Sequence, residues 1–194
     1  MSEVGVLKLK VCLIGENEVG KTSLIRRFVF DQFSDKYIST IGTKITKKKI
    51  KIKHPKTNKP EYVALLIWDI MGQKGVRHLL QESYFKGADG VLGVCDVTRK
   101  RTLSELTNWM TYLDGVGNGF PVVFLGNKCD LERDQEVHRE DIDKFKSQFD
   151  GSAVFLSSAK TGMNVELAFK TLTENMLSEI YKKRVKTRNN TVQI

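Results

Sequence analysis

The sequence predicts an α/β fold, in which a six-stranded, mostly parallel sheet carries helices on both of its faces. Nearly continuous apolar runs, typical of strands that are buried on both sides, alternate along the chain with segments of helical periodicity. One stretch breaks this alternation, because residues 44–68 pass from strand to turn to strand without an intervening helix. We therefore expect one antiparallel strand at an edge of an otherwise parallel sheet.

The elements can be assigned in order along the chain. Apolar runs predict buried strands at residues 11–14, 62–68, 90–95, 121–126 and 153–156. Lysine and isoleucine alternate with a period of two at residues 49–53, as in an exposed edge strand. Amphipathic segments predict helices at residues 22–30, 103–113, 139–149 and 165–181. Residues 1–180 are expected to form one domain, and residues 181–194 a basic, flexible C-terminal tail.

The composition is that of an ordinary globular domain. The 194 residues are 40% hydrophobic and 28% charged, and no run approaches the roughly 20 apolar residues that cross a bilayer. The N-terminus does not resemble a signal peptide, so we expect a cytoplasmic protein. Of the three cysteines, Cys12 and Cys95 fall in predicted strands, and Cys129 follows another. We interpret all three as small buried hydrophobes in a reducing compartment, without disulfides.

The net charge of +9 is unevenly distributed. Residues 44–59 contain eight lysines and no acid, and a second basic cluster occupies residues 182–188. Such patches can attract nucleic acid, anionic lipid or an acidic partner. For the first cluster we favour the simpler interpretation, an edge strand whose lysines prevent edge-to-edge pairing.

Residues 15–22 read Gly-Glu-Asn-Glu-Val-Gly-Lys-Thr, a full match to the phosphate-loop pattern G-x-x-x-x-G-K-[ST]. The match lies between a predicted strand and a predicted helix, where backbone N–H groups and the helix dipole favour an anion. Lys21 would bring its charge to the β- and γ-phosphates, and the Thr22 hydroxyl would ligate Mg²⁺. The other nucleotide-binding candidates of this segment are Glu18, Val19, Gly20 and Ser23. The sequence therefore predicts a site for a nucleoside triphosphate.

A second motif, Asp-Ile-Met-Gly-Gln, occupies residues 69–73 directly after a predicted strand. Here Asp69 would hold the metal through water, and the Gly72 N–H would approach the γ-phosphate. Gln73 would orient the attacking water, so Gln73, Gly72 and Lys21 are the catalytic candidates. Taken alone the motif also fits a turn with an N-capping aspartate, but its place after a strand and downstream of a phosphate loop favours the catalytic interpretation.

Two further motifs follow later strands, at the edge where open α/β sheets bind ligands. Residues 127–130 read Asn-Lys-Cys-Asp, and the Asp130 carboxylate can accept two N–H groups of guanine that adenine does not offer. After the strand at residues 153–156, the backbone N–H of Ala159 could meet the guanine O6. The nucleotide-binding candidates in these two segments are Asn127, Lys128, Asp130, Ser158, Ala159 and Lys160.

This ordered set of motifs resembles the Ras superfamily of small GTPases over about residues 7–180. Residues 37–42 and 84–90, followed by 96–98, look most similar to Rab proteins. The resemblance implies the P-loop NTPase G-domain fold, GTP or GDP as the bound nucleotide, and Mg²⁺. It also implies effector, exchange-factor and GTPase-activating proteins as partners.

The same resemblance implies roles for three further residues. Thr40 would ligate Mg²⁺ when the γ-phosphate is present, because it corresponds to the threonine of a mobile loop. Phe33 would pack against the guanine. Trp68, beside Asp69, would help to form a hydrophobic surface that faces effectors. We therefore expect a Mg²⁺-dependent GTP/GDP switch whose two loops, around residues 34–43 and 70–84, respond to the γ-phosphate.

The phosphate loop departs from the family, which carries small residues where this chain has Asn17 and Glu18. Bulk at Asn17 can displace the attacking water or an activator's arginine, so hydrolysis is expected to be slow even with Gln73 present. Between Phe33 and Thr43 there is also no arginine to act as a finger in cis. The alternative is a GTP-binding module with little or no hydrolysis.

The C-terminus departs as well, since Rab proteins normally end in prenylated cysteines. No cysteine follows Cys129, and residue 2 is serine instead of the glycine needed for myristoylation. From this pattern we expect no lipid anchor and at most a weak, electrostatic contact with membranes. Nucleic acid is a disfavoured partner, because the lysine-rich segment has no interleaved aromatic residues for base stacking.

Overall fold

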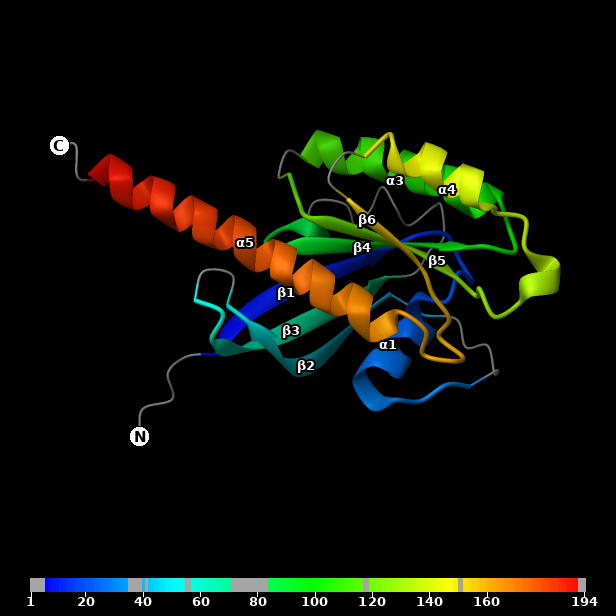
Figure 1. Cartoon of the computed structure of the whole chain (residues 1–194), viewed down its shortest axis with the longest axis horizontal. Helices are drawn as coiled ribbons and strands as arrows, with labels where there is room; N and C mark the ends of the chain where they lie inside the picture. The colour runs from blue at the N-terminus through cyan, green and yellow to red at the C-terminus, as the bar shows by residue number, and fades with distance from the viewer. Residues whose placement is uncertain are drawn as a thin grey trace.

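The computed structural model describes residues 6–34, 40, 42–54, 57–70, 84–116, 119–149 and 152–191. Its six strands form one sheet in the order β2-β3-β1-β4-β5-β6 (Figure 1). The strands are β1 Leu7–Ile14, β2 Thr43–Lys53, β3 Pro60–Ile70, β4 Gly90–Asp96, β5 Val122–Asn127 and β6 Ala153–Leu156. Every neighbouring pair is parallel except β2 and β3, which are antiparallel. The predicted six-stranded sheet with one antiparallel edge strand is confirmed.

The edge strand β2 begins at Thr43, one residue before the strand-turn-strand segment predicted at residues 44–68, and the alternating pattern at residues 49–53 covers only its second half. Its pairing with β3 runs without interruption from Thr43 opposite Ile70 to Lys53 opposite Pro60. The alternation of lysine and isoleucine does not extend into the first half of β2, because Lys48 occupies a position on the face of the strand that packs against α1. There the Lys48 ammonium donates to the Phe28 carbonyl at the end of α1 and lies over the Phe28 ring. An inward lysine is tolerated because it finds an acceptor.

Helices cover both faces of the sheet, as predicted. Their bounds are α1 Lys21–Phe30, α3 Arg101–Val116, α4 Arg139–Lys146 and α5 Val165–Thr191, with a 3-10 turn at Glu132–Asp134. Helices α1 and α5 pack on one face and α3 and α4 on the other (Figure 1). Among the residues that the structure describes, no helix is long and apolar enough to cross a membrane.

The C-terminal ends of α3, α4 and α5 each differ from the prediction by three residues or more, and α3 ends at Val116 instead of residue 113. Helix α4 stops at Lys146, three residues early, because the Gln148 and Phe149 N–H groups bond to carbonyls three residues back and tighten the last turn. Helix α5 continues to Thr191, ten residues beyond the predicted end. Residues 182–191 contain neither glycine nor proline and are rich in basic residues, which suit the C-terminal end of a helix dipole.

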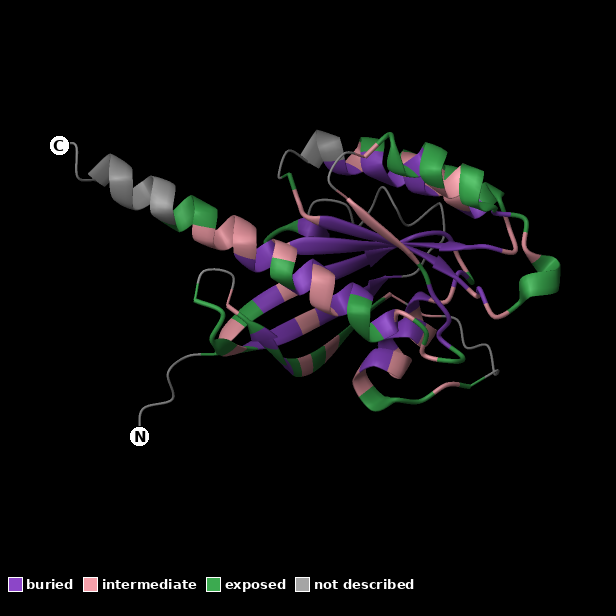
Figure 2. Cartoon of the chain, in the orientation of Figure 1, coloured by how far each residue is buried: buried purple, intermediate pink, exposed green. Residues whose placement is uncertain are grey.

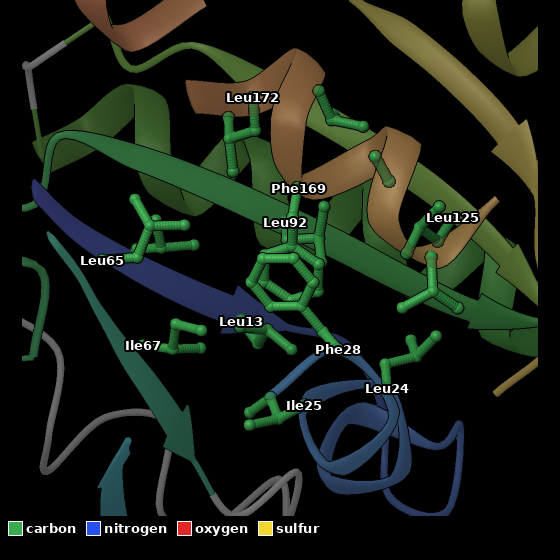
Figure 3. Packing of buried hydrophobic residues seen from close by; sticks show 14 of the residues in the cluster. Leu13, Leu24, Ile25, Phe28, Leu65, Ile67, Leu92, Leu125, Phe169 and Leu172 are labelled. Atoms are coloured by element: carbon green, nitrogen blue, oxygen red, sulfur yellow. The ribbon is translucent and has the colours of Figure 1, made fainter. Parts of the chain in front are cut away.

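The main core lies between the sheet and the pair α1 and α5. Phe28 of α1 stacks on Phe169 of α5 with ring centroids 3.9 Å apart, and leucines and isoleucines of the central strands surround the pair (Figure 3). This packing fixes α1, and with it the loop at its N-terminus, against the carboxyl ends of the strands. The burial pattern in Figure 2 shows that the central strands are almost fully enclosed.

All three cysteines are buried and free, as predicted. Burial raises the pKa of the Cys12 and Cys95 thiols to about 12, so both stay protonated at neutral pH. A buried, protonated thiol behaves as a small hydrophobe.

Candidate nucleotide-binding site

The polar candidates gather at one edge of the sheet because the strands that precede them are parallel and in register. Asp96 at the end of β4 lies opposite Asn127 at the end of β5, and Gly126 of β5 lies opposite Leu156 of β6. The carboxyl ends of these parallel strands therefore lie together beside the N-terminus of α1 (Figure 1). This is the edge at which open α/β sheets bind ligands.

The phosphate loop needs its two glycines for close contact with β4 and β5. Gly15 and Gly20 have φ angles of +137° and +95°, which other residues rarely adopt. A Cβ on Gly15 would lie 2.1 Å from the Val94 carbonyl oxygen, and one on Gly20 would lie 2.3 Å from Nδ2 of Asn127. Substitution at either position would therefore push the loop off its support.

Lys21, the first residue of α1, is only 6% exposed. Its ammonium donates to the carbonyl oxygens of Gly15 at 3.0 Å and Glu16 at 2.8 Å. These bonds turn the long side chain back along the loop and hold its charge in the loop's concave side, where an anion would be attracted.

Asn127 joins the phosphate loop to the last motif. Its Nδ2 donates to the Val19 carbonyl at 2.8 Å, and its Oδ1 accepts from the Ala159 N–H at 3.2 Å. The side chain is 1% exposed, so these bonds are shielded from water. A residue chosen from sequence as a nucleotide contact thus also acts as the joint between three segments of the site.

Three oxygen-bearing side chains converge beyond the phosphate loop. The Thr22 hydroxyl donates to Oδ2 of Asp69 at 2.5 Å, and the Thr40 hydroxyl oxygen lies 3.0 Å from that of Thr22. Asp69 is 2% exposed, and its Oδ1 has no hydrogen-bond partner among the described residues. Burial raises the pKa of the Asp69 carboxyl, partly offset by the Thr22 hydrogen bond and the Lys21 charge.

These atoms fit a magnesium ion. Hydroxyl and carboxylate oxygens are the hard donors that Mg²⁺ prefers, and the ion keeps several waters in its shell. A cation with its waters would satisfy the orphaned Asp69 oxygen, which is costly to leave buried alone. Thr22, Thr40 and Asp69 are the three residues that the sequence assigned to the metal.

Sequence reasoning missed the most heavily bonded carboxylate of the site, Asp96 at the end of β4. Its Oδ2 lies 2.6 Å from the Lys128 ammonium and 3.0 Å from Nε of Arg99, and its Oδ1 accepts from the Thr98 hydroxyl at 2.7 Å. Burial alone would raise the Asp96 pKa, but these donors outweigh it and hold the pKa below its ordinary value. The available signal was its position, since Asp96 also follows a buried strand at the ligand-binding edge.

Sequence reasoning also missed Arg99. This residue connects Asp96 to the phosphate loop. Its Nη2 donates to the Asn17 carbonyl at 3.0 Å, and its Nη1 lies 3.9 Å from the Glu18 carboxylate. Arg101 lies 3.3 Å from Oε1 of Glu16, the other acid of this loop. Arg99, just before α3, and Arg101, its first residue, offset negative side chains that would otherwise repel a phosphate.

The remaining candidates lie around this centre. Phe33 is half-buried and packs at the margin of the main core, and Asp130 is half-buried in the turn after β5. Ser158 is buried, with its hydroxyl accepting from the Thr161 N–H at 3.0 Å. Ser23 is half-buried on the first turn of α1.

A third missed residue, Arg27, orders the last motif. It donates from α1 to the carbonyls of Ala159 at 2.9 Å and the exposed Lys160 at 2.5 Å. Gly72 and Gln73 lie outside the described residues.

Comparison with known proteins agrees with this geometry. The Ras family model matches residues 10–178 of the chain. Ras-related protein Rab-13 of Bos taurus is 35% identical over 181 residues, which cover 93% of this chain and 85% of that protein. Ras-related protein Rab-12 of Mus musculus is 33% identical, covering 89% of this chain and 69% of that protein. Ras-related protein Rab-8 of Diplobatis ommata is also 33% identical, covering 90% and 80%.

The family match covers most of the chain, and the relatives all carry Rab names. The predicted resemblance and the predicted fold are confirmed together. The chain belongs to the Ras family and is a Rab-like small GTPase.

Proposed function

We propose that this GTPase is a Mg²⁺-dependent switch that alternates between GTP-bound and GDP-bound states and hydrolyses GTP slowly. The observation that carries the proposal is the contact between Thr40 and Thr22. Thr40 comes from the segment between α1 and β2, yet its hydroxyl oxygen lies 3.0 Å from that of the phosphate-loop threonine. A residue so placed can respond to whether a third phosphate is present.

Bound Mg²⁺ would neutralise charge on the β- and γ-phosphates. Thr22 and Thr40 would hold it directly and Asp69 through water, in keeping with the fit of their oxygens. Lys21 would orient the phosphates from the concave side of the loop, where two carbonyls already fix its ammonium. Gly72 is proposed to donate its N–H to the γ-phosphate and Gln73 to orient the attacking water.

Guanine is the proposed base. Asp130 follows β5 on the same turn as Lys128, whose positive φ of +68° and ion pair with Asp96 fix the backbone before it. The carboxylate would accept the N1–H and N2–H groups of guanine, and the Ala159 N–H, which here donates to Asn127, is proposed to meet the guanine O6. Phe33, Ser158 and Lys160 are proposed to contact the same nucleotide.

Slow turnover is proposed because the sequence between Phe33 and Thr43 contains no arginine that could act in cis, and because Asn17 is expected to bring an amide close to the γ-phosphate position. A supplied arginine finger is worth roughly 10³–10⁵ in rate, so an activating protein is the expected partner. Effectors and exchange factors would read and reset the two switch segments. A second candidate function is a GTP-binding module with little hydrolysis. The observation that favours it is the hydrogen bond from Arg99 to the Asn17 carbonyl, which holds this residue in the phosphate loop.

One experiment tests the nucleotide. The protein purified from cells is denatured, and the released nucleotide is identified by chromatography. In a separate sample, the bound nucleotide is removed without denaturation, and the binding of GTP, ATP and XTP to this nucleotide-free protein is measured. We expect guanine nucleotide alone, and we expect Asp130→Asn to lose GDP affinity and gain relative preference for xanthine nucleotides. Equal binding of ATP and GTP by the wild type would contradict the proposal.

A second measurement separates the switch from the non-hydrolysing module. Phosphate release is followed over many turnovers for the wild type and for Gln73→Ala. A slow wild-type rate that falls further in the variant supports an enzyme. Equal rates in both proteins would support the binding module.

A further inference from the structure

The sulfur atoms of this chain differ in how far an oxidant in solution can reach them. Five of the sulfur-bearing residues that the structure describes are buried: Cys12, Cys95, Cys129, Met110 and Met176. The remaining one, Met163, is 53% exposed. Met1 and Met71 lie outside the described residues. Among the described sulfur atoms, the Met163 thioether is therefore the one that an oxidant meets first.

The thiols have a second, chemical protection. The thiolate is the form of cysteine that reacts. Burial raises the pKa of Cys12 and Cys95 to about 12, and burial together with the charge of Asp130 raises the pKa of Cys129. All three groups are therefore thiols at neutral pH and react slowly with peroxide. A thioether has no proton to lose, so Met163 lacks this protection.

The backbone of Met163 belongs to the loop between β6 and α5, beside the last of the predicted nucleotide motifs (Figure 1). Its carbonyl accepts from the Ser158 N–H at 3.2 Å, and its N–H donates to the Thr161 hydroxyl at 3.3 Å. The Ser158 hydroxyl accepts from the Thr161 N–H at 3.0 Å. Met163 is thus bonded into a tight loop with residues 158–161.

The side chain of Met163 reaches a second segment of the site. The Cys129 thiol, in the turn after β5, donates to Sδ of Met163, and the two sulfur atoms are 3.6 Å apart. The Cys129 backbone N–H donates to the Ser157 carbonyl at 3.1 Å. One exposed methionine therefore contacts both residues 127–130 and residues 157–160, the two segments proposed to hold the base, although neither motif contains it.

Oxidation would change this contact. A thioether is apolar and flexible, whereas a sulfoxide is polar and chiral. Two sulfur atoms 3.6 Å apart leave no room for an oxygen atom between them. An oxygen added on the Cys129 side would therefore push the two residues apart, and one added on the solvent side would draw the side chain toward water. Both changes would weaken the contact between the loop and the turn.

We propose that Met163 is a reversible oxidation site, and that its sulfoxide loosens the turn after β5 and speeds the release of bound nucleotide. The co-reactant is hydrogen peroxide. Its O–O bond breaks and an S–O bond forms, so that the sulfur is oxidised by two electrons. The proton of the transferred oxygen passes to the leaving hydroxide, which becomes water. Methionine sulfoxide reductases, one for each epimer, reverse the step.

The oxidation itself does not depend on the proposed function, whereas the effect on nucleotide release rests on it. The first test therefore maps the site alone. Full-length protein loaded with Mg²⁺ and GDP is treated with dilute hydrogen peroxide, and the peptides are analysed by mass spectrometry. We expect Met163 to gain one oxygen before Met110 and Met176 do, with Cys129 still a thiol. Earlier oxidation of Cys129, or equal oxidation of Met163 and Met176, would overturn the site.

The second test measures release of a fluorescent GDP analogue before and after peroxide. The oxidised wild type is expected to release it about threefold faster or more, and treatment with reductases for both epimers to restore the original rate. Met163→Leu keeps an apolar side chain of similar volume but has no sulfur, so peroxide is expected to leave its release rate unchanged. A response that persists in Met163→Leu would assign the effect to another residue and overturn the inference.

Cys129→Ala tests the contact between the two sulfur atoms. Met163 stays exposed in this variant, so mass spectrometry is expected to find its sulfoxide as in the wild type. GDP release is expected to become insensitive to peroxide, because the contact that the sulfoxide weakens is already absent. A response as large as that of the wild type would show that the sulfoxide does not act through Cys129, and this outcome would contradict the inference.

Backbone amide NMR supplies a readout that needs no assumption about the nucleotide. We expect the amide signals of Cys129 and Ser158 to shift on oxidation of the wild type and to stay in place in Met163→Leu. A protein that proved to bind no guanine nucleotide would contradict the proposed function, while these shifts would still support the site. A sulfoxide at Met163 that moved neither amide signal and left GDP release unchanged would overturn the inference.

Discussion

The ammonium of Lys128 lies 2.6 Å from Oδ2 of Asp96, and this ion pair joins the turn after β5, which is proposed to bind the base, to the end of the central strand β4. Because Arg99 binds the same Asp96 oxygen and also the Asn17 carbonyl, one carboxylate supports both the turn after β5 and the loop of residues 15–22. The Asp96 side chain is 1% exposed, whereas Lys128 and Arg99 are 33% and 27% exposed. Lys128 and Arg99 therefore keep part of their hydration, whereas the buried Asp96 carboxylate depends on these two cations for the stabilisation of its charge.

Replacing Asp96 by Asn should destabilise the protein and release nucleotide faster. The change removes the charge that holds two cations, at a cost on the order of 2–3 kcal/mol of unfolding free energy. This is below the range for a fully buried pair because Lys128 and Arg99 remain partly hydrated. Urea unfolding and the dissociation rate of a fluorescent GDP analogue measure the two effects.

Asp143→Asn is the control for that experiment. Asp143 pairs with Arg139 on the surface of α4, where side chains of 86% and 56% exposure contribute little. A change there is expected to cost less than about 0.5 kcal/mol and to leave GDP dissociation unaltered. If Asp96→Asn behaved like this control, the proposed support of both loops would be wrong.

Asp96 also predicts a pH dependence of stability. Its pKa is lowered in the folded protein, so it contributes stability above its unfolded pKa of about 4. That contribution should disappear as the pH falls through the lower, folded pKa. We expect the gap in unfolding free energy between wild type and Asp96→Asn to be constant above about pH 4.5 and to shrink below about pH 4. A gap that widens with acid would contradict the direction of the shift.

Gly20→Ala should displace Asn127. The new Cβ would lie 2.3 Å from Nδ2 of Asn127, so the bond from Asn127 to the Val19 carbonyl has to break or shift. We expect the unfavourable φ to lower the unfolding free energy by roughly 1–3 kcal/mol. In addition, we expect a rise in the GDP dissociation rate that backbone strain alone does not explain. Stopped-flow release of labelled GDP measures the rate.

Gly87→Ala separates the two causes. Gly87 also has a positive φ of +69°, but a Cβ at this position would meet no atom of the described residues within 4 Å beyond its chain neighbours. The variant is expected to lose stability without a change in GDP release. Similar release rates for both alanine variants would show that Asn127 does not couple the loop to nucleotide retention.

Thr22→Ala and Thr40→Ala should differ in how they affect Mg²⁺. Thr22 belongs to the phosphate loop and donates to Asp69, whereas Thr40 comes from a separate segment that is proposed to respond to the γ-phosphate. We expect Thr22→Ala to weaken Mg²⁺ binding with both nucleotides and Thr40→Ala only with a GTP analogue. Magnesium titrations of both complexes provide the measurement. An equal effect of Thr40→Ala in the two states would contradict the switch.

The sequence predicted the sheet well because each parallel strand is a continuous apolar run and each motif follows one. It predicted β2 less well, since Lys48 breaks the alternation for a reason that lies in α1, twenty residues earlier. In the site, the linear motifs identified Lys21, Thr22 and Asp69. Arg99 and Arg27 belong to no motif, and their roles depend on contacts with segments 82 and 132 residues distant in the chain. Such contacts become visible only in the fold.

Asn17 should restrain hydrolysis. Arg99 binds its backbone carbonyl, so Asn17→Gly keeps that bond while it removes the amide that is expected to compete with water and with an incoming arginine. Unaided turnover of the wild type is expected at or below the order of 10⁻⁴ s⁻¹ that Ras-type domains show without a partner's arginine. Asn17→Gly should raise unaided or activator-stimulated turnover, and Gln73→Leu should lower it in either background. Single-turnover phosphate release measures all four proteins, and GDP affinity serves as the control because neither side chain is expected to contact the base or the β-phosphate. Slower hydrolysis by Asn17→Gly would mean that the asparagine positions the water instead of obstructing it.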